Sequence, residues 1–117
     1  MIGMRKLELS EIKAKYANLD NQDKCTCLNY VAHDLTIFGR EFYNSPAQRN
    51  LATINEIAHI LTGEIAKLLR GDKQHYPDEI LIEILFEKNR LFSDASCEQE
   101  LTRAIRNSFQ WLSNYSN

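Results

Sequence analysis

The chain has 117 residues, 44% of them hydrophobic, and its 14 Lys and Arg residues against 16 Asp and Glu residues give a net charge of −2 at pH 7. This length predicts a single helical domain over 1–117, with frayed ends at 1–8 and 114–117. The charge balance disfavours general nucleic-acid binding, which draws on a basic excess. No apolar run approaches the roughly 20 residues of a membrane-spanning helix. The opening residues also lack the apolar core of a signal peptide, so we expect a cytoplasmic protein without a membrane partner.

The chain holds an odd number of cysteines, Cys25, Cys27 and Cys97, which is typical of reduced thiols in a cytoplasm. Cys25 and Cys27 form a C-x-C pair, and no second pair completes the four ligands of a structural zinc site. The sequence also has no glycine-rich phosphate loop. We therefore expect neither a metal site nor a cofactor.

Apolar residues recur at steps of three and four along almost the whole chain, and no segment alternates as a half-buried strand would. This pattern predicts an all-α fold, a compact bundle of four to five amphipathic helices with a long antiparallel central hairpin. A first helix is expected after Ser10, a good N-cap, and before the polar run 20–23. A second helix is expected over 23–43. Its apolar stripe consists of Leu28, Val31, Leu35, Phe38 and Phe42.

The junction between the second and third helices carries the clearest local signal. Ser45 is expected as the N-cap, Pro46 in the first helical position and Gln48 at the capping-box position. The third helix then continues at three-four spacing to Arg70, and Gly71 is a suitable residue just past its end. These two long helices make up the predicted hairpin.

The fourth helix is expected to start at Pro77, and its apolar residues are unusually dense. The residues predicted to face the core are Ile80, Leu81, Ile84 and Leu85. Ile82 and Phe86 fall off that stripe, so this helix is either deeply buried or offers apolar surface to a partner.

The fifth helix is expected to start at Ser93 or Asp94, either of which can serve as its N-cap. Its apolar stripe consists of Cys97, Leu101, Ala104, Ile105, Phe109 and Leu112.

Acidic residues are concentrated in one segment of the chain. Residues 71–100 hold eight acidic and three basic side chains, a net of −5. Glu79, Glu83 and Glu87 are spaced i, i+4, i+8 and therefore line one ridge of the fourth helix. Such a charged surface raises the association rate with a basic partner and adds to specificity.

These observations favour a non-catalytic protein-binding module, because an acidic surface is present and a recognisable reaction centre is not. Among such modules we favour an inhibitor or immunity-type protein, which neutralises a toxin, for example a basic nuclease, by direct binding. Aromatic side chains are frequent binding hot spots and add two possible anchors. The expected partner contacts are Asp78, Glu79, Glu83, Phe86, Glu87 and Trp111.

Two other functions fit parts of the sequence. His33, Arg40, Glu56 and His59 would form the centre of a small helical enzyme acting on RNA or nucleotides, if they met across the hairpin. Glu56 and His59 also have the E-x-x-H spacing of di-metal bundles, but the chain has one such copy on a predicted helix where those sites need two. The third possibility is a regulatory homodimer that pairs through the seams of the hairpin.

Overall fold

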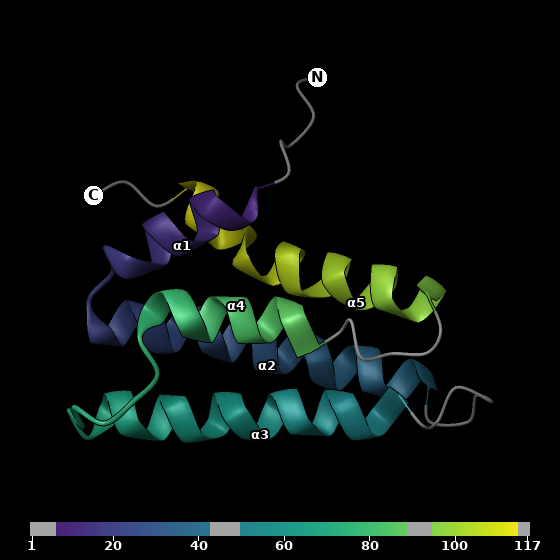
Figure 1. The fold of residues 1–117 in the computed structure, drawn as a ribbon, viewed down its shortest axis with the longest axis horizontal. Coiled ribbons are helices and arrows are strands. Elements are labelled where there is room, and N and C mark those ends of the chain that lie inside the picture. The colour runs from purple at the N-terminus through teal and green to yellow at the C-terminus, as the bar shows by residue number, and fades with distance from the viewer. Residues whose placement is uncertain (1–6, 43–49, 89–94, 115–117) are drawn as a thin grey trace.

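The computed structural model describes residues 7–42, 50–88 and 95–114, which form five α-helices and a short 3₁₀ helix and contain no strand. The helices are α1 (Leu9–Ala17), α2 (Asn21–Phe42), α3 (Asn50–Leu69), α4 (Asp78–Lys88) and α5 (Ala95–Ser108), followed by the 3₁₀ helix η2 (Phe109–Asn114). They pack into one compact bundle (Figure 1), which confirms the predicted all-α class. None of the described helices is long and apolar enough to cross a membrane.

The two longest helices, α2 and α3, lie side by side and run in opposite directions in Figure 1. Their connection, 43–49, is outside the described residues, and the predicted capping residues Ser45, Pro46 and Gln48 fall within it. The closed hairpin therefore stays a prediction. The predicted caps of the fifth helix, Ser93 and Asp94, are likewise outside the described part of the chain.

Helix α1 begins earlier than its sequence predicts. Glu8 is the N-cap and forms a capping box with Glu11, so Ser10 is an exposed residue of the first turn and not the cap. Leu7 and Ile12 occupy the two positions of a hydrophobic staple around this cap, and both are buried. Leu7 is therefore a core residue, although it belongs to the segment 1–8 that is predicted to fray.

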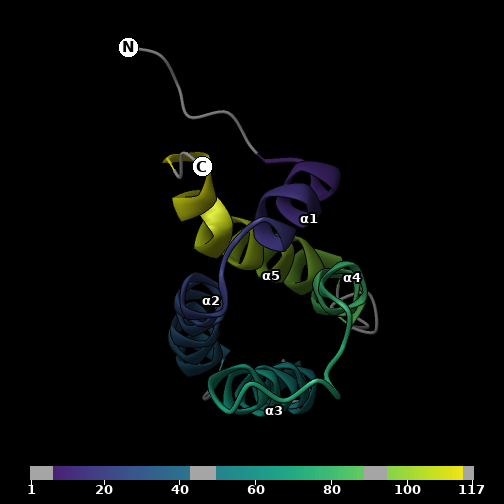
Figure 2. The ribbon, with the colours of Figure 1, turned by 90° about the vertical axis from the view of Figure 1, so that its left-hand side faces the viewer.

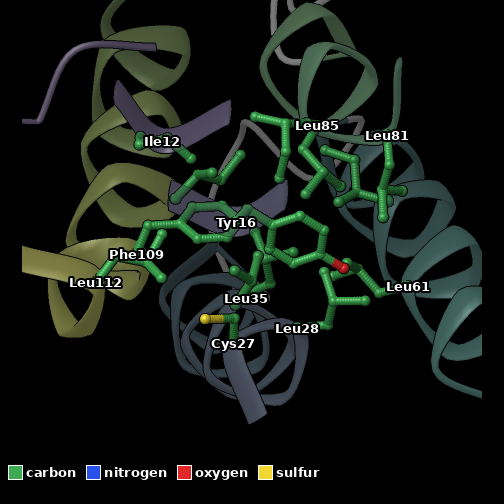
Figure 3. Packing of buried hydrophobic residues seen from close by; sticks show 14 of the residues in the cluster. Ile12, Tyr16, Cys27, Leu28, Leu35, Leu61, Leu81, Leu85, Phe109 and Leu112 are labelled. Atoms are coloured by element: carbon green, nitrogen blue, oxygen red, sulfur yellow. The ribbon is translucent and has the colours of Figure 1, made fainter. Parts of the chain in front are cut away.

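The interior contains most of the stripes predicted on the second and fifth helices, together with one face of α3. The fully or almost fully buried residues include Leu28, Val31, Leu35 and Phe38 of α2, Ile54, Ile57, Leu61 and Leu68 of α3, and Leu101 and Ile105 of α5 with Phe109 and Leu112 of η2. Figure 2 shows α2 and α4 on opposite sides of this interior, with α3 below them and α1 and α5 above. The side chain of Tyr16 reaches from α1 into the middle (Figure 3).

The buried face of α4 differs from the predicted one. Leu81, Ile82 and Leu85 are buried, whereas Ile80 is 45% exposed. The prediction that Ile80 faces the core is therefore wrong, and Ile82 is buried by the protein itself. Helix α4 packs against α1, α3 and α5 together, and these three contacts select an arc centred on 81, 82 and 85.

Helix α3 ends as its sequence predicts. Gly71 has a φ of 69°, and its N–H donates to the carbonyl of Leu68 at 3.1 Å. The N–H of Asp72 donates to the carbonyl of Lys67 at 2.9 Å. These two bonds are the Schellman pattern, which needs a left-handed residue and therefore favours glycine. The turn sends the chain back along the bundle toward α4.

Candidate partner-binding surface and buried polar groups

The outer face of α4 gathers exposed acidic side chains around one exposed apolar residue. Glu79, Ile80, Glu83 and Glu87 are all exposed. At 3.6 residues per turn, these four positions fall within roughly 100° of the helix circumference. We call this set the α4 acidic face.

One carboxylate of the α4 acidic face already has a cationic partner. The Lys13 ammonium of α1 lies 3.0 Å from Oε1 of Glu83, and 54% of the Glu83 side chain remains exposed. An ion pair with this much solvent around it is weakly held, so a second cation can compete for the same carboxylate.

Asp78, the first residue of α4, serves the fold. Its Oδ2 accepts a hydrogen bond of 2.8 Å from the Lys24 ammonium, and the two side chains are 20% and 12% exposed. This pair joins α2 to α4. Asp78 is therefore not part of the α4 acidic face, although the sequence suggests it as a partner contact.

The two aromatic anchors expected from the sequence are both partly buried. Phe86 is partly buried and packs against the core. Trp111 of η2 is also partly buried, and its ring lies 6.5 Å from that of Tyr30 on α2. Since α2 and α4 stand on opposite sides of the bundle (Figure 2), Trp111 does not extend the α4 acidic face. Ile80 within that face and Tyr76 just before the helix are both exposed.

The residues considered for an enzyme do not form a buried cluster. His33 and Arg40 of α2 and Glu56 and His59 of α3 are all exposed. Within 7–42, 50–88 and 95–114, no three His, Cys, Asp or Glu side chains are placed to hold a metal ion.

The two thiols of α2 are buried and free. Burial, with a smaller contribution from Asp23, raises the pKa of Cys27 to about 12, and burial also raises the pKa of Cys25. A thiol that stays protonated at neutral pH is a poor nucleophile and a poor metal ligand. The side chain of Cys97 is outside the described part of the chain.

A buried carboxylate that the sequence analysis missed lies at the corner between α3 and α4. Glu64 is only 2% exposed. Its Oε2 accepts a hydrogen bond of 3.2 Å from the N–H of Tyr76, and its Oε1 accepts one of 3.4 Å from the Lys67 ammonium. The signal was present in the sequence, because Glu64 falls between Leu61 and Leu68 on the buried stripe of α3.

The interior also contains a polar group without a partner. Tyr16 is fully buried, and its hydroxyl makes no hydrogen bond within the described residues. Its ring makes an edge contact with that of Phe109, with centroids 6.4 Å apart, and the Lys24 ammonium lies 5.7 Å from its centroid. Burial, followed by the nearby Asp78 carboxylate, raises the pKa of Tyr16 well above its ordinary value.

No protein-family model, curated protein or solved structure matches this chain.

Proposed function

We propose that this chain is a non-catalytic protein-binding module that docks a basic protein on the α4 acidic face. We further propose that it acts as an inhibitor of the immunity type, which neutralises a toxin by covering it. The observation that carries the proposal is the exposure of Glu79, Glu83 and Glu87 on one side of α4, in a segment with a net charge of −5.

Charge complementarity supports a basic partner. The carboxylates of the α4 acidic face attract a partner that carries Lys and Arg side chains, and they raise its rate of association from solution. Nucleases bind phosphates through basic sites, which makes a basic nuclease a suitable toxin for such a surface.

Apolar contact supports a protein partner in preference to a small cation. Ile80 is 45% exposed beside Glu79 and Glu83, and Tyr76 just before the helix is 42% exposed. Binding energy in interfaces is concentrated in a few apolar or aromatic residues that charged groups surround. Ile80 and Tyr76 therefore replace Phe86 and Trp111 as the anchors of the proposed interface.

The test compares two double variants with equal changes in net charge. Glu79→Lys/Glu87→Lys reverses the α4 acidic face and leaves the Lys13–Glu83 pair in place. Glu56→Lys/Glu100→Lys reverses two exposed carboxylates on α3 and α5. Both variants should keep the helical circular dichroism of the wild type.

The expected result of a tagged pull-down from native lysate is one stoichiometric basic protein with the wild type and with the α3/α5 variant. The purified partner should bind the α4 variant at least roughly tenfold more weakly, as loss of complementary charge predicts. Capture of no basic protein, or equal affinity for both variants, would remove this function.

A homodimer is the second candidate, because one outer face of α2 keeps apolar side chains exposed. Tyr30 and Ile37, two turns apart, are each 45% exposed. Sedimentation equilibrium tests this candidate directly. A dimer that Ile37→Glu dissociates would support it, and a monomer at all accessible concentrations would exclude it.

A further inference from the structure

The side chain of Tyr16, which joins α1 to the interior, carries a hydroxyl that makes no hydrogen bond within the described residues. The hydroxyl oxygen of Tyr16 lies among Leu28, Leu61 and Leu81, which come from α2, α3 and α4 (Figure 3). A hydroxyl that leaves water without gaining a hydrogen bond destabilises the state in which it is buried. A phenylalanine would fill the same space without that cost.

Two polar contacts of α1 with other elements lie at its margin. Lys13 pairs with the half-exposed Glu83 of α4, and the Lys15 ammonium donates to the carbonyl of Leu112 in η2 at 3.2 Å. A nine-residue helix is not stable in isolation, so its docking has to offset the entropy of ordering the whole segment. Apolar burial is therefore the main force that keeps α1 closed.

We infer that α1 is a releasable lid, which opens as a unit while α2 to α5 stay folded. The hinge is the turn between α1 and α2, at 18–20. In the open state the Tyr16 hydroxyl is hydrated, and the leucines beneath it become accessible. Partial opening of this kind is drawn from the least stable segments of a fold.

Opening of the lid also changes the charge of the α4 acidic face, and its effect on binding rests on the proposed function. Opening withdraws Lys13 from Glu83, the central carboxylate of that face. A basic partner and the closed lid therefore compete for Glu83, and binding of one favours release of the other.

Amide hydrogen exchange of the full chain, followed by NMR without any partner, tests the lid independently of the docking proposal. The amides of 12–17 should exchange faster than the core amides of α2 and α3, with a weaker dependence on denaturant than global unfolding shows. Tyr16→Phe should slow exchange in α1 by roughly tenfold, because it removes the buried hydroxyl. Lys13→Ala should speed it by a factor of about two to five, as the loss of an exposed ion pair predicts.

Tyr30→Phe is the matched control, because it removes the hydroxyl of an exposed tyrosine outside α1. It should leave exchange in α1 unchanged. The lid is wrong if the α1 amides exchange only through global unfolding, or if Tyr16→Phe fails to slow them. Failure of the charge-reversal experiment with an intact exchange result would remove the docking proposal alone.

Discussion

Two buried polar side chains of this bundle differ in how their polar atoms are hydrogen-bonded. Glu64, at the corner of α3 and α4, accepts hydrogen bonds from the Tyr76 N–H and the Lys67 ammonium. Tyr16, under α1, has a fully buried hydroxyl with no partner in the described part of the chain. The first group holds a turn in place through its bonds, whereas the second is tolerated because the ring that carries it packs well. Variants of Tyr16 and Glu64 separate these two cases, and smaller effects are expected at Cys27 and Gly71.

The largest effect is expected from removal of the Tyr16 ring. Tyr16→Ala deletes a fully buried aromatic side chain and should lower the free energy of unfolding by about 3–5 kcal/mol. Tyr16→Phe keeps the ring and should leave that free energy equal or higher. Urea denaturation of the two variants measures both. A clear loss of stability in Tyr16→Phe would mean that the hydroxyl has a partner, and the contrast with Glu64 would disappear.

Truncation of Glu64 should have the next largest effect. Glu64→Ala leaves the N–H of Tyr76 without its acceptor, which predicts a loss of about 1–3 kcal/mol. Glu64→Gln keeps an oxygen for that N–H and should lose less than half as much. Urea denaturation gives both values. Equal stability of the wild type and Glu64→Ala would show that this corner is held by packing alone.

Alkaline pH should weaken the interior under α1. Burial raises the pKa of Cys27 to about 12, while an unfolded cysteine has a pKa of about 8.5. The protonated Cys27 thiol contributes its full stability at pH values below the pKa of the unfolded state. As the pH rises from there toward the pKa of the folded state, that contribution falls by about 1.4 kcal/mol per pH unit. The wild type should therefore lose about 1.5 kcal/mol more than Cys27→Ala between pH 8.5 and pH 10. Urea denaturation at each pH measures the free energy of unfolding of both proteins. An equal change with pH in the two proteins would contradict this prediction.

The smallest effect is expected at the turn that leads to the Glu64 corner. Gly71 has a φ of 69°, and a Cβ there would meet no atom within 4 Å. Gly71→Ala therefore costs backbone strain alone, about 1–2 kcal/mol. Gly63→Ala is the control, since Gly63 lies within α3 with equally open space around it, and it should stabilise the helix. Thermal unfolding of both variants decides the sign.

Helices with one long apolar stripe could be predicted from the sequence, and the short dense helix could not. The stripes of α2, α3 and α5 allow one orientation, because turning the helix would expose several large side chains at once. In α4 apolar residues occupy more than half of the circumference, so several orientations bury similar areas. Contacts with α1, α3 and α5 make the choice, and they leave Ile80 outside.

The candidate surface likewise has a part that the sequence predicts and a part that it does not. The spacing of Glu79, Glu83 and Glu87 was sufficient to place them on one exposed ridge, since carboxylates at i, i+4, i+8 share a face and favour water. The role of Asp78 could not be predicted, because its partner, Lys24, is 54 residues away in the sequence. Residue type alone suggests Trp111 as an anchor for the ridge, whereas its contact with Tyr30 places it on the side of α2.

By itself, the sequence determined the helical class, most of the helical stripes, the turn at Gly71 and the acidic character of α4, because these depend on interactions within a few residues. Only the tertiary structure decided which side of α4 is buried, that Glu64 holds the corner and that the Tyr16 hydroxyl has no hydrogen-bond partner within the described residues. Burial and hydrogen bonding at those positions depend on helices that are distant in the sequence, and local spacing carries no information on how such helices meet.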